Sequence, residues 1–384
     1  MRNSATPPTT PTTPTPPTTP TTPPRPFDVT EVFPQLAPLA RTATRLHPRP
    51  GSPTPQDSSV GGPLLWPADE PWPHCEEPHV VDGLNPAPSP AYVRLGRHLQ
   101  AVERVRDLTE EERQTLLRMA PRRREPGQPP ACPPEGPIAM LPVAQLYARD
   151  VPDLNPPRGA DLLQVLWCPF DHPIMPRTAL FWRDAAAVTD ILTTPPEPPV
   201  MQFHDYLPEP CLLHPEQVTD YPDHLELGEE LRDRLTDWAV WQTSDAVGSA
   251  MPHLRASFER NFDRELSEAD ERELDSFLPQ YYDNELAGAP GWKVGGWPRW
   301  GATDPCPRTC PDCGHPMDAL MTVATFEDND DSSWQPYEPS GERSTGPDAY
   351  DPDQPTKVQI GSGYDQQLYI CPASPLHRHL ELMH

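Results

Sequence analysis

Lys-Val-Gly-Gly-Trp-Pro, at residues 293–298, repeats late in the chain a pattern that already stands at residues 59–63 as Ser-Val-Gly-Gly-Pro. After each copy come a cysteine and an apolar segment, and then a second apolar segment that ends in Cys-Pro. The closing segments are residues 162–169 and 367–372. Four landmarks in the same order predict a duplicated unit and two pseudo-equivalent lobes.

The two copies differ in the length of chain between their landmarks. We align their first apolar segments by placing Val143 opposite Val323. On this alignment the first copy carries an insert near residues 76–131, and the second carries one near residues 327–357. Inserts rich in polar residues, Pro and Gly are typical of surface loops.

Composition favours a β-rich α+β fold with a helical connector between the lobes. Proline occurs 61 times, which disfavours long helices and favours short strands and turns. The middle of the chain differs, because Leu225, Leu231 and Leu235 recur at helical spacing in a strongly charged stretch. A helix is also expected near residues 109–120, where Thr-Glu-Glu-Glu forms a capping box.

These patterns divide the chain into four parts. Residues 6–24 contain only Thr and Pro, which cannot bury apolar surface, so we expect a disordered tail at residues 1–26. The remaining parts are a first lobe at 27–195, a helical connector at 196–288 and a second lobe at 289–384.

The charge of the chain bears on its partners. The formal net charge is −27, from 57 acidic and 30 basic residues. A surface this acidic repels phosphate backbones, so we expect no nucleic-acid partner. It suits a basic protein, such as a nuclease-like toxin whose DNA-binding face it could mimic.

The compartment is inferred from the termini and the cysteines. The first residues lack the apolar core of a signal peptide, and no run of about 18 apolar residues occurs. We therefore expect a cytoplasmic protein with no membrane partner. In that reducing compartment, the eight cysteines indicate metal ligands or buried thiols rather than disulfides.

Cys310-Pro-Asp-Cys313-Gly has the form of a zinc knuckle. Two residues between the thiolates let one tight turn place both sulfur atoms on one ion, and the glycine relieves the turn. Tetrahedral zinc takes four ligands, and the repeat nominates Cys371 as the third, because it ends the strand expected beside the knuckle. The fourth ligand is His377, or else one of Cys306, His315 and His379.

Two other interpretations of the knuckle stay open. The cysteines could form a redox pair, although the βαβ context of thioredoxin-like proteins is not evident. A catalytic zinc is less favoured than a structural one, since nothing obvious supplies an open coordination position with a general base.

The first copy predicts a weaker second metal site. If the insert splits the knuckle, the ligands are Cys75, Cys132, Cys168 and His172. The competing interpretation is that these isolated cysteines are buried apolar residues of the core.

Motifs for catalysis are missing from the sequence. It contains no Gly-x-Ser-x-Gly elbow and no His-Glu-x-x-His, so we name no catalytic or cofactor-binding residue and expect a binding protein. The alternative is a hydrolase or small-molecule enzyme with its site in a cleft between the lobes. That cleft would be lined by Trp66, Trp72, Trp297 and Trp300.

The repeated motifs also carry a resemblance. They are residues 59–63 with Trp-Pro at 66–67, Val-Ala-Gln-Leu at 143–146, and residues 293–298 with the late strand before Cys371. In these motifs the chain resembles the YwqG-like family of bacterial domains of unknown function, over roughly residues 55–380. The resemblance implies a compact, β-rich, internally duplicated fold. Because some relatives are thought to accompany secreted-toxin systems, it also implies an immunity-like or binding role. The chain departs from the family in its large first insert and its single closing cysteines.

Overall fold

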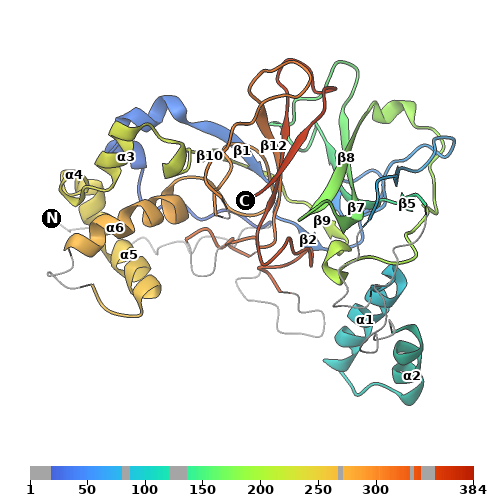
Figure 1. Cartoon of the computed structure of the whole chain (residues 1–384). Coiled ribbons are helices and arrows are strands. Elements are labelled where there is room, and N and C mark those ends of the chain that lie inside the picture. The colour runs from blue at the N-terminus through green and yellow to red at the C-terminus, as the bar shows by residue number, and fades with distance from the viewer. Residues whose placement is uncertain are drawn as a thin grey trace, which may run out of the picture.

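The computed structural model of the chain describes residues 19–79, 87–120, 136–266, 271–301, 303–328, 333–338 and 351–384. In these residues the chain has an α+β fold with three β-sheets, and it is rich in strands, as its composition predicts (Figure 1). None of the described helices is both long enough and apolar enough to span a bilayer.

The first large sheet contains six antiparallel strands. Along its inner strands, buried and exposed residues alternate little, and most residues are buried, as expected of strands covered on both faces. In spatial order they are β10 (Glu216–Asp220), β1 (Arg41–Arg45), β11 (Lys293–Gly295), β12 (Asp318–Val323), β13 (Gln366–Ile370) and β14 (Leu380–Met383).

The second large sheet also has six strands, and a small sheet of two strands accompanies it. In spatial order its strands are β2 (Arg49–Pro50), β9 (Cys211–Leu212), β3 (Ser59–Val60), β6 (Leu141–Tyr147), β7 (Leu162–Asp171) and β8 (Pro176–Arg183). The small sheet pairs β4 (His74–Cys75) with β5 (Ile138–Ala139).

The strand orders of the two large sheets correspond. The run β3-β6-β7-β8 takes the same place in the second sheet as β11-β12-β13-β14 in the first. In both sheets the second strand of this run bulges against the third. Each Val-Gly-Gly motif therefore begins a four-stranded antiparallel unit.

The pairing of the Val-Gly-Gly strands corrects our alignment of the copies. Val60 lies opposite Ala144, and Val294 lies opposite Met321. Ala144 and Met321 thus take the same place, and the alignment made from the sequence is out of step by three residues. Short, fully buried strands lack the alternation that would reveal their register in a sequence.

The chain crosses twice between the two sheets. The consecutive strands β1 and β2 belong to different sheets, and so do β9 and β10. The first sheet thus takes β1 from the predicted first lobe and β10 from the predicted connector. The boundaries at residues 195 and 289 therefore do not separate the sheets, because paired strands come from distant parts of the chain.

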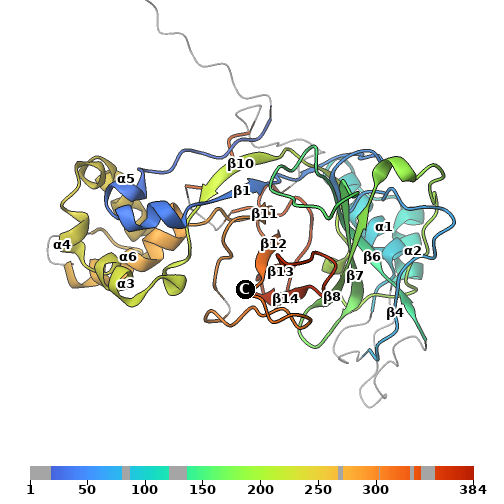
Figure 2. The ribbon, with the colours of Figure 1, turned by 90° about the horizontal axis from the view of Figure 1, so that it is seen from above.

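A common apolar core lies between the sheets, which stand next to each other in Figure 2. It unites buried residues of β6 and β7 with residues of β11, β12 and β13. The edge strands β8 and β14 also bond to each other, since Thr178 Oγ1 donates to Glu381 Oε2 at 2.6 Å. Side chains therefore fill the seam between the sheets.

The helices lie outside the sheets in two groups. The first group belongs to the insert of the first copy, where Thr109 and Glu112 form the capping box that the sequence predicts. The second group forms a body around Trp241, Phe258 and Phe277 of the predicted connector, and this body also takes in Phe33 and Leu36 from the predicted first lobe. The α-helices are α1 (Pro90–Glu103), α2 (Glu110–Met119), α3 (Glu229–Leu235), α4 (Trp238–Trp241), α5 (Asp245–Phe262) and α6 (Glu271–Tyr281). Short 3-10 helices are η1 (Val29–Glu31), η2 (Pro34–Leu39), η3 (Ala185–Ala187), η4 (His204–Tyr206) and η5 (His224–Glu226), and η6 (Tyr282–Leu286) is a π-helix.

Part of the predicted disordered tail packs against the protein. Thr21 forms a β-bridge with Tyr337, and the backbone N–H of Thr22 donates to Glu216 at 2.6 Å. The guanidinium of Arg25 donates to the carbonyl oxygen of Leu286 at 2.8 Å. Residues 19–26 therefore differ from the prediction, because Arg25 and the backbone of this segment find hydrogen-bond partners. Residues 1–18 lie outside the described part of the chain.

The second Val-Gly-Gly turn encloses a buried ion pair. Lys293 Nζ donates to Asp220 Oδ2 at 2.6 Å, and both residues are inaccessible to solvent. Gly296 has a φ of +69°, and a Cβ atom there would lie 2.3 Å from the same oxygen. Only glycine allows the turn to approach Asp220 so closely.

Acid should destabilise the protein through His47. This residue is fully buried between Arg45 and Arg49, and burial lowers the pKa of His47 to about 4 although its hydrogen bond with Glu216 opposes the shift. A histidine with a lowered pKa is neutral in the folded state and takes up a proton more readily once unfolded. Its contribution is therefore complete above about pH 6.5 and is lost as the pH falls towards 4, by about 3 kcal/mol at most.

The substitution His47→Asn isolates this contribution, since asparagine tolerates the positive φ of 43° at this position. Urea unfolding at about pH 7.5 and pH 5 should show a loss of stability that is smaller in the variant by about 2 kcal/mol. Equal losses in both proteins would assign the acid sensitivity to other groups.

Candidate metal centres

Two Cys/His groups lie at corresponding places on the two sheets. The knuckle cluster consists of Cys310, Cys313, Cys371 and His377. The strand cluster consists of Cys75, His79, Cys168 and His172. In each cluster, the four candidate ligand atoms lie within 4.8 Å of one another.

The knuckle cluster is built on the turn that the sequence predicts. The backbone N–H of Gly314 donates to the carbonyl of Cys310 at 2.9 Å, and Gly314 has a φ of +76°. Cys371 directly follows β13, as expected from the repeat. His377 lies in the segment between β13 and β14, where its N–H bonds to Ser374.

The distances in the knuckle cluster suit a tetrahedral ion. Cys310 Sγ lies 3.5 Å from His377 Nδ1, and Cys313 Sγ lies 3.4 Å from Cys371 Sγ. Zinc with sulfur and nitrogen ligands spaces neighbouring ligand atoms by about 3.3–3.8 Å. The fourth position thus falls to His377, and Cys306, His315 and His379 are not part of the group. This is the set of four residues that the sequence placed first.

Two features prepare the knuckle cluster for a cation. Asp312, inside the knuckle, accepts hydrogen bonds from the backbone and guanidinium of Arg378, which holds the two ligand-bearing loops together. Burial opposes ionisation of Cys371, but hydrogen bonds from the backbone N–H groups of Ser374 and Ala373 and from the Cys313 thiol lower the pKa of Cys371. The thiolate is the form that binds metals.

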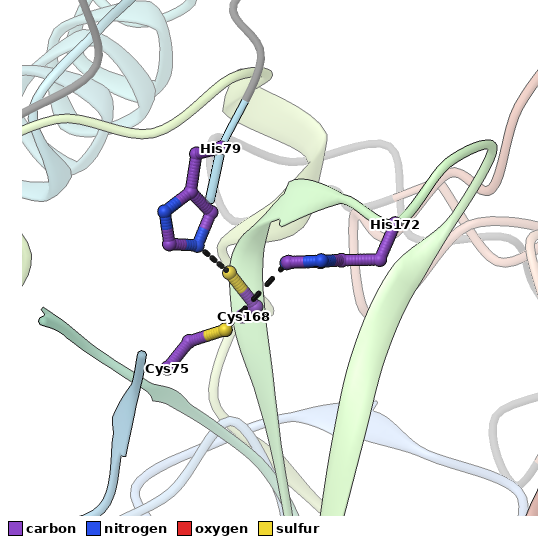
Figure 3. Close-up of side chains that lie close together, drawn as sticks. All are labelled: Cys75, His79, Cys168 and His172. Atoms are coloured by element: carbon purple, nitrogen blue, oxygen red, sulfur yellow. Dashed lines mark hydrogen bonds between the residues drawn. The ribbon is translucent and has the colours of Figure 1, made fainter. Parts of the chain in front are cut away.

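The strand cluster gathers its ligands from two stretches of chain that lie far apart in sequence (Figure 3). Cys75 lies on β4 and Cys168 on β7, while His79 and His172 lie in the segments that follow these strands. His79 Nε2 lies 3.1 Å from Cys168 Sγ, and Cys75 Sγ lies 3.6 Å from His172 Nε2. The four side chains converge on a common point.

Electrostatics also favour a cation in the strand cluster. The hydrogen bond from Cys168 lowers the pKa of Cys75 to about 5, and His79 and His172 act in the same direction, while burial opposes the shift. The same hydrogen bond raises the pKa of Cys168, so Cys75 is the thiol that ionises first. The other ring nitrogen of His172 faces the Glu77 carboxylate at 3.5 Å. A carboxylate behind a ligating histidine is a common device that fixes the orientation of the ring and raises its basicity.

His79 is the ligand that the sequence did not reveal. We expected Cys132 in its place, and Cys132 lies outside the described residues. A local signal was available, because Cys75 and His79 have the same Cys-x-x-x-His spacing as Cys168 and His172. The knuckle pattern favours Cys132 instead, because a zinc knuckle contains two cysteines and His79 is not a thiol.

Pairing on the sheets explains why the two clusters correspond. Cys168 and Cys371 take equivalent positions, because each comes three residues after the residue that pairs with Ala144 or Met321. The β-bridge between Thr309 and Pro316 closes the knuckle, just as the pair β4–β5 closes the base of the first insert. The first insert therefore enters the fold where the second copy has only its knuckle turn.

Replacing His79 by alanine should weaken metal binding at the strand cluster alone. One of four ligands is lost, so the affinity should fall by at least about 100-fold while the knuckle cluster keeps its metal. Competition titration with a chromophoric chelator measures both sites. The matched control is His74→Ala, since His74 is exposed on β4 and outside the cluster. Equal affinities in His79→Ala and His74→Ala would remove His79 from the ligand set.

A third group joins Asp223, His224 and Asp283. Its carboxylates already have backbone donors: Asp223 caps a helical turn through Leu225 N–H at 2.9 Å, and Asp283 accepts the N–H of His224 at 2.8 Å. Burial, and then the charge of Asp283, raise the pKa of Asp223 to about 6. These contacts account for the group as a structural element.

The four tryptophans proposed for an interlobe cleft serve as packing. Trp66 and Trp72 lie in a small buried core behind the second sheet, 5.1 Å apart between ring centroids. Trp297 stacks on the guanidinium of Arg41, and Trp300 is nearly buried. Each indole N–H donates to a protein oxygen close by, which holds these side chains in their packing positions.

Comparisons with known proteins give no relative. No protein-family model matches the chain, and no curated protein matches it either.

Proposed function

We propose that the chain is a binding protein whose two halves are each fastened by a structural zinc ion. The ligand sets carry this proposal: three thiols and one imidazole in the knuckle cluster, and two of each in the strand cluster. Soft sulfur ligands combined with imidazole in a group of four favour zinc over calcium, magnesium or manganese.

A structural role is favoured over a catalytic one by the number of ligands. A catalytic zinc ion keeps one position open for water, whereas each cluster here offers four protein ligands. In the first sheet, the ion would join the connection between β13 and β14 to the segment that precedes β12. In the second sheet, it would join the connection between β7 and β8 to the segment that precedes β6. That linkage stabilises connections that the apolar core does not reach.

We further propose that the two sheets arose by duplication. The matched strand orders, the bulges on β6 and β12 and the corresponding clusters support this origin. The same features agree with membership of the YwqG-like family, which we propose on the motifs quoted above.

The proposed role is recognition of a basic protein, with an immunity-like function. The net charge of −27 supports a partner of opposite sign. The packed seam between the sheets favours binding over the alternative, a hydrolase or small-molecule enzyme with its site in that seam.

X-ray absorption spectroscopy at the zinc edge tests the structural role. The zinc-loaded protein should give five sulfur and three nitrogen ligands per two ions, at about 2.3 Å and 2.0–2.1 Å. An oxygen ligand at either ion would indicate an open position and would contradict the structural role.

The partner is tested separately by capture on the immobilised full chain. A protein with a high isoelectric point should be retained at about 50 mM salt and released at several hundred millimolar, since salt screens charge pairs. Absence of any enriched basic protein across the low-salt range would contradict the proposed partner while leaving the zinc sites untouched.

A further inference from the structure

A basic cavity lies beside the second sheet, and none of its described lining residues belongs to a metal cluster. Its volume is about 500 Å³, which is the size of typical small-molecule sites. One wall is helix α1, and the facing wall consists of residues 207–210 and 355–357. Gly61 of the first Val-Gly-Gly motif lies between the two walls.

The charge of this cavity is opposite to that of the protein. Arg94, Arg97 and Arg104 recur at helical spacing, so that α1 presents one basic face to the cavity. Lys357 adds a fourth cation from the facing wall, and Glu209 is the one carboxylate among the lining residues that the structure describes. In a chain with a net charge of −27, such a concentration of cations attracts anions locally.

Two of these arginines differ in how firmly other residues hold their guanidinium groups. Arg97 is held in place, because it pairs with Glu209 at 3.1 Å and donates to the carbonyl of Leu207 at 2.8 Å. Arg94 pairs with Glu197, but both side chains are about half exposed, and such pairs contribute little energy. Arg94 is therefore available to an incoming anion at small cost.

The rest of the described lining combines apolar residues with the polar side chains of His98 and Gln100. Five prolines contribute to it, three from the facing wall and two from strands of the sheet, and proline offers no N–H donor and little conformational freedom. Flat apolar surface beside cations suits a ligand with an apolar ring and a negatively charged group. The prolines are Pro50, Pro142, Pro208, Pro210 and Pro355.

The cavity is formed in advance by close contacts. The N–H of Glu209 donates to the carbonyl of Thr356 at 2.7 Å, which joins the two segments of the facing wall. Gly61 has a φ of +63°, and a Cβ atom there would lie 2.9 Å from the carbonyl oxygens of Pro208 and Glu209. The first Val-Gly-Gly motif thus lets the wall approach the sheet.

We propose that this cavity binds a phosphorylated organic molecule with a flat apolar body, such as a nucleotide. The phosphates would lie among Arg94, Arg104 and Lys357, and the ring would lie against the prolines. This site is independent of the zinc ions and of the acidic surface proposed to meet a protein.

Isothermal titration calorimetry of the full, zinc-loaded chain with ATP tests the proposal. We expect one ATP per chain, with an affinity that falls when the salt concentration is raised from about 50 to 300 mM. Adenosine and inorganic tripolyphosphate, each alone, should bind at least about tenfold more weakly than ATP, since each uses half of the site.

Charge reversal at the cavity supplies the matched comparison. The double variant Arg94→Glu/Lys357→Glu should weaken ATP binding at least about 30-fold, because two attractions become repulsions. Arg113→Glu, on an exposed face of the neighbouring helix α2, should leave binding unchanged. No binding of ATP or tripolyphosphate at millimolar concentration, or equal loss in both variants, would overturn the proposal. Tripolyphosphate binding as tightly as ATP would overturn the role of the prolines.

Discussion

Replacing Cys371 by serine should remove one of two bound zinc ions and lower the melting temperature by about 5 °C. A ligand that saturates the folded state at about 1,000 times its dissociation constant contributes about 4 kcal/mol of stability. With an unfolding entropy of about 2.1 cal/mol/K per residue, a chain of 384 residues shifts its melting temperature by roughly 1–2 °C for each kcal/mol. Serine keeps the shape of the side chain but supplies no thiolate, so the loss arises from the metal.

Cys306→Ser is the matched control for this substitution. Cys306 precedes the same knuckle turn and is exposed, and it lies outside the cluster. The control should keep both ions and its melting temperature, as measured by zinc content and differential scanning calorimetry. If Cys306→Ser and Cys371→Ser lose zinc equally, or if neither does, the ligand set is wrong.

Replacing Lys293 by methionine should lower the free energy of unfolding by about 3–5 kcal/mol. Burial lowers the pKa of Lys293, and the nearby Asp220 carboxylate opposes that shift. Methionine leaves this carboxylate buried without a cation, although the N–H of Ala289 still donates to it at 2.9 Å. An uncompensated charge in the core destabilises the folded state by far more than the intact ion pair stabilises it.

A double variant distinguishes this cause from lost packing. Lys293→Met combined with Asp220→Asn buries no charge and retains a carbonyl acceptor for Ala289, so it should recover at least about half of the loss. The exposed pair on helix α2 is the control, since Arg113→Met should change stability by less than about 0.5 kcal/mol. Urea unfolding measures all three. A double variant no more stable than Lys293→Met would show that the methylene packing of Lys293 matters more than its charge.

The knuckle cluster could be assembled from the sequence because its geometry is local. Cys310 and Cys313 share one turn, and the repeat pointed to Cys371. His377 follows Cys371 at a spacing that a single loop can close. The strand cluster is harder, because Cys75 and His79 stand at the start of the long insert, whereas Cys168 and His172 stand at the end of another strand. Only the repeated Cys-x-x-x-His spacing links Cys75 to His79.

The pairing of the outer strands could not be predicted. β1 and β10 lie far apart in sequence, and they meet in a sheet whose other strands come from the last third of the chain. Sequence periodicity describes the faces of a strand but not its partner. The same limit explains the misplaced register of the first apolar segments. The order of the Val-Gly-Gly units, by contrast, follows from their motifs, because hairpin-connected strands are usually neighbours in space.

Native mass spectrometry of the protein, purified without a chelator, is the most direct test of the metal-fastened fold. We predict two zinc ions per chain, one in each cluster. A single ion would contradict the strand cluster as a metal site and leave Cys75 and Cys168 as core residues. A chain without metal, with all eight thiols free, would contradict both sites.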